Sequence, residues 1–158
     1  MAVQLTYTKN MPKALPGLIG WDFGTADLTS MLAEGVLPYG NAVKKGSKAR
    51  TAVVGNTGVL GFVARSLMSI YAIDNNVDAH GPKEMAAIMR EGYLWTTNKS
   101  ATGVVDNAAV YVNASGELVN TGDAGAALVP GCSIEIGGAA GAMVLIRIQT
   151  TIPAPAAP

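Results

Sequence analysis

Turn-forming residues recur along most of this chain and divide it into short apolar runs. The clearest turn is the Gly-Asn-Thr-Gly of residues 55–58, which separates the runs 51–54 and 59–64. Gly and Asn tolerate the left-handed backbone conformations that a tight turn needs, so this pattern predicts a β-hairpin. Similar turn signals stand at residues 74–76, 98–100, 113–116 and 121–123. Turns at this spacing favour an all-β fold, a small β-sandwich or barrel-like domain of short antiparallel strands.

The runs between these turns have the composition of strands. They lie at residues 92–97, 109–112, 133–136 and 142–149. Residues 82–90 begin with Pro and are rich in Glu, Met and Ala, which favours a helix, but their apolar side chains also alternate. We interpret this segment as a strand, with a helix as the alternative. Residues 28–33 could form a helical turn.

The chain divides into three regions. Residues 1–30 combine frequent Pro and Gly with apolar and aromatic side chains, which predicts an extended N-terminal arm lying along another surface. Packing of this arm on its own domain as an edge strand is an equally favoured alternative. Residues 31–149 form the β domain, and residues 150–158 have Pro at alternate positions, typical of an extended or disordered tail.

The charge content is low and balanced. Charged residues make up 14% of the chain, with 11 basic and 11 acidic side chains, whereas about 25% is usual for soluble domains. A surface so poor in charge indicates that part of it is covered by protein partners. Nucleic-acid binding is not expected, because it usually leaves a basic footprint. The densest basic cluster, at residues 44–50, is interpreted as a solvated turn.

No membrane segment is expected either. The apolar run at residues 136–146 is about half the length of a membrane-spanning helix. Residues 1–7 lack the basic stretch and apolar run of a signal peptide. The protein is therefore expected to be soluble.

Residues that could support catalysis or metal binding are few. His80 is the single histidine and stands beside Gly81 and Pro82, where a solvated loop position is expected. Cys132 is the single cysteine and is interpreted as a small buried apolar residue. Residues 74–78 carry side-chain oxygens at intervals that suit Ca²⁺, but a polar turn is the better interpretation. Residues 137–141 are predicted to join the last two strands. The chain is expected to be neither an enzyme nor a metal- or cofactor-binding protein.

In their order along the chain, several segments resemble the structural cement proteins that decorate the heads of tailed phages. The matching segments are residues 1–7, 15–19, 34–43 (EGVLPYGNAV, similar to a PFGxAV hairpin motif), 58–65, 87–96, 106–116, 129–133 and 143–148. Three departures occur: Tyr39 stands in place of Phe, residues 106–108 replace Gly-Asp, and residues 22–24 have no counterpart. The family's motifs are structural and carry no catalytic residues.

This resemblance implies a capsid decoration protein on the outer surface of the virion. Its partners would be the major capsid protein and further copies of itself. The first expected oligomer is a homotrimer, and the second is a homodimer. Aromatic and large apolar residues are favoured at such interfaces. The candidate interface residues are Leu5, Tyr7, Met11, Leu15, Trp21, Phe23, Tyr39, Tyr93 and Trp95.

Two other function classes remain open. Tyr93 and Trp95 are two residues apart in a predicted strand, so they share one face and could form a stacking platform for carbohydrate. The same spacing suits a core face or a subunit interface. A hydrolase would have to use His80 or Cys132 and would lose its activity on His80→Ala.

Overall fold

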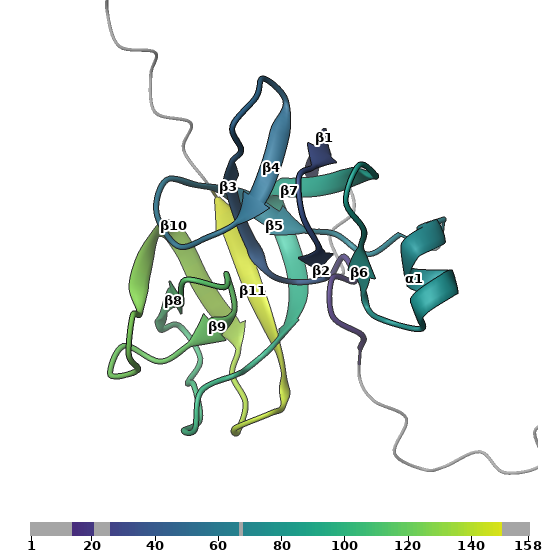
Figure 1. The fold of residues 1–158 in the computed structure, drawn as a ribbon. Coiled ribbons are helices and arrows are strands. Elements are labelled where there is room, and N and C mark those ends of the chain that lie inside the picture. The colour runs from purple at the N-terminus through teal and green to yellow at the C-terminus, as the bar shows by residue number, and fades with distance from the viewer. Residues whose placement is uncertain (1–13, 21–25, 67, 150–158) are drawn as a thin grey trace, which may run out of the picture.

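A computed structural model describes residues 14–20, 26–66 and 68–149 of the 158 residues. The prediction of an all-β fold is confirmed (Figure 1). The described part contains a single helix, α1, which is Ile70–Asn75. The strands are β1 (Asp27–Ala33), β2 (Leu37–Pro38), β3 (Ala42–Lys45), β4 (Thr51–Val54), β5 (Val59–Val63), β6 (Ala79–His80), β7 (Met85–Thr97), β8 (Ala109–Val112), β9 (Leu118–Val119), β10 (Ala127–Ile136) and β11 (Met143–Gln149).

Five strands close into a small barrel in the order β1-β4-β3-β5-β7, because β7 also pairs with β1. Closure removes the free strand edges that an open sheet would expose. One of these pairings differs from the antiparallel arrangement expected from sequence, since β1 and β4 run parallel. Strand β1 also corrects a second expectation, because residues 28–33 form a strand and not a helical turn.

The turn at residues 55–58 is present, but the predicted hairpin is wrong. Strands β4 and β5 do not pair with one another, because β3 lies between them and pairs with both. The amide of Gly55 donates to the carbonyl of Ala42 at 3.2 Å, so this connection crosses β3. The hairpin is instead formed by β3 and β4, whose loop carries the basic cluster with Lys45, Lys48 and Arg50 exposed.

Strand β7 connects the barrel to a second sheet. Its first half pairs with β1 and β5, and its second half pairs with β11 from residue 91 to residue 97. Gly92 lies between the halves with a φ of 125°, a conformation that other residues rarely adopt. The strand interpretation of residues 82–90 is confirmed from Met85 onward. The second sheet continues in the order β7-β11-β10-β8-β9, and residues 137–141 join β10 to β11 as predicted.

The buried apolar residues form two clusters. One is formed by residues of the barrel strands together with Leu37 and Tyr39: Met31, Ala33, Leu37, Tyr39, Val43, Ala52, Val63, Ala86 and Ile88. A larger cluster between the sheets includes Phe62, Met89, Leu94, Leu118, Ile134, Ile146 and Ile148. Within the barrel wall, β5 approaches β7 so closely that a Cβ atom at Gly61 would overlap the carbonyl of Met89. In the described residues, no helix has the length and apolar character needed to cross a membrane.

Candidate interaction surface

The chain leaves the barrel after β5 and returns at β7, and we call residues 64–84 the α1 excursion. It contains α1 and the short strand β6, which pairs with β2. Four of its large apolar side chains are exposed to solvent. Met68 is 86% exposed, Ile70 68%, Ile73 69% and Val77 43%. We call these four residues the α1 patch. The sequence analysis did not predict this surface. The helix α1 has only six residues and none of them is buried, so its sequence shows no division into a buried and an exposed face.

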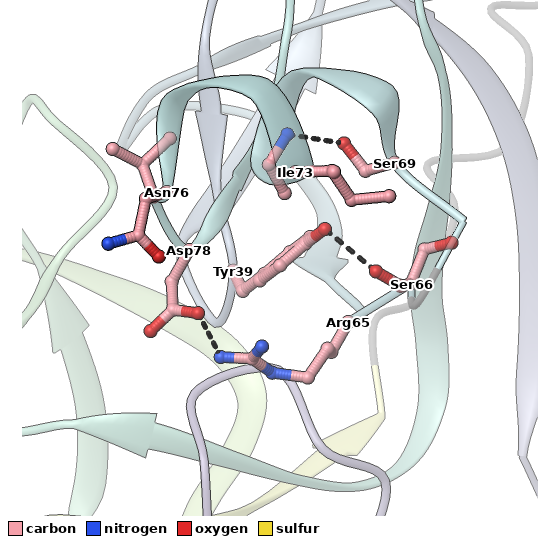
Figure 2. A pocket seen from close by; sticks show the side chains of 9 residues that line it. Tyr39, Arg65, Ser66, Ser69, Ile73, Asn76 and Asp78 are labelled. Atoms are coloured by element: carbon pink, nitrogen blue, oxygen red, sulfur yellow. Dashed lines mark hydrogen bonds and ion pairs between the residues drawn. The ribbon is translucent and has the colours of Figure 1, made fainter. Parts of the chain in front are cut away.

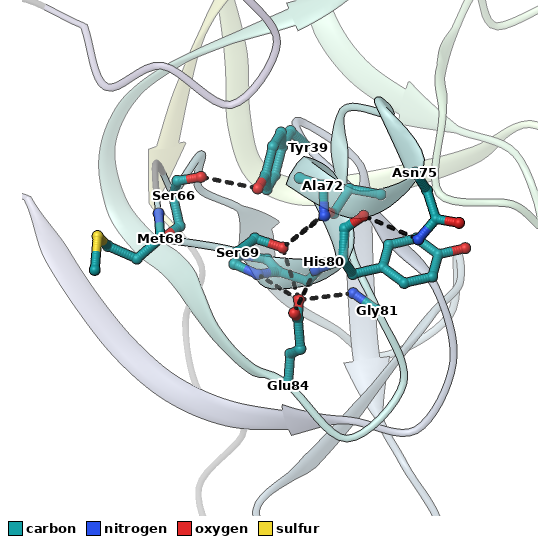
Figure 3. A network of polar contacts seen from close by, with 11 residues as sticks. Tyr39, Ser66, Met68, Ser69, Ala72, Asn75, His80, Gly81 and Glu84 are labelled. Atoms are coloured by element: carbon teal, nitrogen blue, oxygen red, sulfur yellow. Dashed lines mark hydrogen bonds and ion pairs between the residues drawn. The ribbon is translucent and has the colours of Figure 1, made fainter.

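A carboxylate holds the α1 excursion in place (Figure 3). Glu84 accepts hydrogen bonds from the Ser69 hydroxyl at 2.7 Å, the Tyr71 amide at 2.7 Å and the Gly81 amide at 2.9 Å. Desolvation raises the pKa of Glu84, but these hydrogen bonds outweigh it and lower the pKa to about 2. Ser69 is the N-cap of α1 and also accepts from the Ala72 amide at 3.2 Å. One ionised group thus ties the start of the helix to the start of β7.

His80 corrects the expectation of a solvated loop histidine. It lies in β6 and is 2% exposed, with its ring edge-on to Tyr39 at 5.1 Å between centroids. Its Nδ1 lies 3.6 Å from a Glu84 oxygen, beyond normal hydrogen-bonding distance. Burial lowers the pKa of His80, while the Ala64 carbonyl and the Glu84 carboxylate act in the opposite direction. A two-residue strand followed by Gly-Pro gives no sequence signal of burial, which explains the error.

Arg65 lies beside Tyr39 and Asp78 (Figure 2) and also joins the α1 excursion to the segment that precedes the barrel. Its guanidinium lies 4.8 Å from the centre of the Tyr39 ring and forms an ion pair with Asp78. Its Nε donates to the Pro16 carbonyl at 3.1 Å, and its backbone amide donates to the Gly17 carbonyl at 2.7 Å. Between these groups and α1 is a hollow of about 350 Å³. It is lined by Tyr39, Arg65, Ser66, Ser69, Ala72, Ile73, Asn76, Val77 and Asp78.

Residues 14–20 pack on their own domain as an added strand. The Gly17 amide donates to the Trp95 carbonyl at 2.7 Å, the Trp95 amide to the Leu18 carbonyl at 2.8 Å, and the Gly20 amide to the Tyr93 carbonyl at 2.7 Å. This part of the predicted arm therefore follows the edge-strand alternative. Ala14 is buried, whereas Leu15 and Leu18 remain exposed.

The candidate interface residues fall into three groups. Leu15 is 44% exposed, and Tyr93 and Trp95 are half-buried on the face opposite the core residue Leu94. Tyr39 is 3% exposed and lies at the inner wall of the hollow against the Arg65 guanidinium, so it offers little surface to a partner. The others, which are Leu5, Tyr7, Met11, Trp21 and Phe23, lie outside the described residues.

The residues considered for catalysis or metal binding are placed unfavourably for either role. Cys132 is buried in the core between the sheets, as expected, and burial raises the pKa of its thiol. Residues 74–76 end α1 and supply its left-handed C-cap, Asn76, instead of forming a simple turn. Within residues 14–20, 26–66 and 68–149, no three His, Cys, Asp or Glu side chains gather as a metal site would require.

A closed β-barrel with an exposed apolar patch, and with a polar network that holds α1 in place, has the character of a structural binding protein. The chain belongs to the phage structural cement protein family, because the model of that family, described as structural cement protein (E217 gp24/Pam3 gp6), matches residues 3–149. It therefore has a structural role in a phage capsid. The family resemblance found in the sequence is confirmed.

The fold recurs in a solved capsid structure. A chain of "The capsid of Myoviridae Phage XM1" is similar with a TM-score of 0.73 and 16% identity, over 94% of this chain and 98% of that chain. At this identity the likeness shows the fold alone. The comparison with curated protein sequences gave no match.

Proposed function

We propose that copies of this protein associate with each other and bridge neighbouring major capsid protein subunits on the outer surface of the head, so that they stabilise the expanded shell. The observation that carries this proposal is the α1 patch. Met68, Ile70 and Ile73 are each more than two-thirds exposed in a chain whose charge content is low. A cluster of exposed apolar side chains in a family of capsid proteins is best explained by contact with other proteins.

The physical basis of stabilisation is simple. A head filled with DNA is under internal pressure, and it opens first where subunits meet. A protein bound across such a seam must be released before the seam can separate. When several linked copies bind together, effective concentration strengthens the whole assembly, so each single contact can be modest. We propose a trimer as the first stoichiometry and a dimer as the second.

The candidate residues outside the described part belong to the same proposal. The arm with Leu5, Tyr7, Met11, Trp21 and Phe23 supplies apolar and aromatic anchors for the capsid or for a neighbouring copy. Leu15, which is exposed, belongs to the same set of candidate residues.

The carbohydrate alternative is less well supported by the geometry. Tyr93 and Trp95 are half-buried instead of standing free as a platform. Leu145, the partner of Trp95 across β7 and β11, is fully buried, and Gly20 lies against Tyr93 and Leu145. The face that would stack on a sugar is therefore partly covered by the chain's own residues 14–20.

The test uses expanded heads that lack this protein. Purified protein is added, and bound protein and the temperature of head rupture are measured across a series of salt concentrations. We expect saturable binding and a higher rupture temperature. If the heads bind no protein at any salt concentration, the proposal is contradicted. The variant Ile73→Ser alters the α1 patch. Its matched control is Val105→Ser, at a residue that is 70% exposed and lies outside the α1 patch.

A further inference from the structure

We propose that the α1 patch, together with the hollow beside it, is the docking site for residues 1–13 of a second copy of this chain. The inference rests on the proposed function in one respect, the association of copies. It goes further by naming the surface and the segment that meet: an apolar arm with two lysines from one copy, and on the next copy an apolar surface near which Asp74 and Asp78 are exposed.

The receiving surface is preformed. Ile70 and Ile73 are three residues apart in α1, so they stand on one face of the helix. Ile73 and Val77 continue from the patch into the hollow, whose inner wall includes the ring of Tyr39 (Figure 2). The hydrogen bonds of Ser69 and Glu84 fix the helix before any partner arrives. A surface held in this way loses little conformational freedom on binding.

Charge complements the apolar contact. Residues 66–78 carry Asp74 and Asp78 and contain no Lys or Arg. Asp78 is paired with Arg65, but its side chain is still 55% exposed, and Asp74 is exposed as well. Residues 1–13 show the opposite pattern, with Lys9 and Lys13 and no acidic residue. Complementary charges of this kind favour the correct partner and its orientation.

The position of the arm's root makes exchange between copies geometrically reasonable. The described chain begins at Ala14, and the Pro16 carbonyl is bonded to Arg65 on the rim of the hollow. Arg65 thus places the start of the described chain beside the hollow. Thirteen extended residues span up to about 45 Å, which is enough to reach a neighbour. In a trimer each arm would enter the next copy around the ring, and in a dimer the two copies would exchange arms reciprocally.

The other segment outside the described part is a weaker occupant. Residues 150–158 carry no charge and no aromatic side chain. They follow β11, whose last residue, Gln149, pairs with Glu91 on the opposite edge of β7 from residues 17–20. Neither charge nor position therefore directs this tail to the α1 patch.

The decisive experiment places a photo-crosslinking amino acid at position 73 of the full chain. Unlabelled protein carrying it is mixed with an equal amount of ¹⁵N-labelled wild type, bound to cement-free heads and irradiated. We expect peptides from residues 1–13 of the labelled copy to be joined to position 73. The proposal would be overturned if position 73 were joined only to peptides of the unlabelled chain that carries the crosslinker. Crosslinks only to residues 150–158 or only to the capsid protein would also overturn it.

Paired variants give a second readout. Ile70→Ser/Ile73→Ser and a chain lacking residues 1–13 should each weaken self-association roughly tenfold or more, whereas Val105→Ser should not. Mixing the two impaired chains should restore mixed pairs, because each supplies the part that the other lacks. Unchanged association in both variants would contradict the inference.

The same measurements separate the inference from the proposed function. If these variants still associate and stabilise heads like wild type, the arm–patch contact is wrong and the proposed function stands. If the wild-type protein binds no heads, the proposed function itself fails.

Discussion

The hydroxyl of Ser69 donates to the carboxylate of Glu84 at 2.7 Å and at the same time accepts the amide of Ala72 at 3.2 Å. This relationship connects the first turn of α1 to the residue just before β7, across fifteen positions of sequence. It explains how a helix of six residues, with no buried side chain of its own, keeps one orientation on the barrel. The apolar side chains of the α1 patch are displayed by this polar anchor.

Loss of the anchor should loosen α1 before it unfolds the barrel. Ser69→Ala removes an N-cap, a loss that typically lowers stability by about 1 kcal/mol, and it also deprives Glu84 of a donor. We expect a lower unfolding midpoint in denaturant and faster amide exchange confined to residues 69–84. Thr57→Ala, in an exposed connection, is the control. Equal exchange in α1 for both variants would show that Ser69 is not the anchor.

Acid should weaken the fold through Glu84 and Glu34. Hydrogen bonds from Thr51, Ser47 and Lys48 lower the pKa of Glu34 to about 2, as the α1 excursion does for Glu84. Carboxyl groups with a depressed folded pKa contribute stability that is present above their unfolded pKa of about 4.5 and is lost as pH falls toward 2. Thermal unfolding at a series of pH values should show this decline. Glu84→Gln should reduce its slope, and the double variant with Glu34→Gln should reduce it further; an unchanged slope would contradict the role of both groups.

His80 should act at higher pH. Because its folded pKa lies below its ordinary value of 6.5, the unfolded chain takes up a proton first as the solution is acidified. Stability due to the neutral ring is therefore present above pH 6.5 and falls as pH drops below it. His80→Gln should flatten the stability profile between about pH 7.5 and 5.5 without changing its slope below pH 4.5. A wild-type profile that is already flat in the upper range would contradict this account.

The barrel wall should be sensitive to a single methyl group. Gly61→Ala would push a Cβ atom into the Met89 carbonyl of β7, where backbone and not a flexible side chain must move. We expect a loss of about 1–3 kcal/mol in unfolding free energy. Gly35→Ala is the matched control, since nothing lies within 4 Å of the added atom. Its stability should be unchanged or slightly raised. Equal effects at the two positions would mean that β5 and β7 can separate freely.

Much of the fold follows from local sequence patterns. Turn residues and alternation located most strands, including the first half of β7, where helix propensity favoured the wrong element. Pairing was harder to predict. The turn at residues 55–58 has hairpin chemistry, yet β3 inserts between its two strands, because barrel closure depends on contacts distant in sequence.

The exposed apolar side chains could be predicted only in part. Leu15 was predicted as an interface residue and is exposed, and its place at an interface stays a prediction. The α1 patch was not predicted, because isoleucines such as Ile70 and Ile73 in a short apolar run cannot be distinguished from core residues by sequence. Their exposure depends on where Glu84 and Ser69 hold the helix, which no local pattern shows. His80 was misplaced for the same reason, because its burial depends on β2, Tyr39 and Glu84.

The central claim, that this protein acts by joining capsid subunits, is tested most directly by a cryo-EM reconstruction of a complete head. We predict density for the barrel on the outer surface, placed over the seam between two major capsid protein subunits, with neighbouring copies in contact through α1. Density on the inner surface, or isolated copies that each touch one subunit away from any seam, would contradict it.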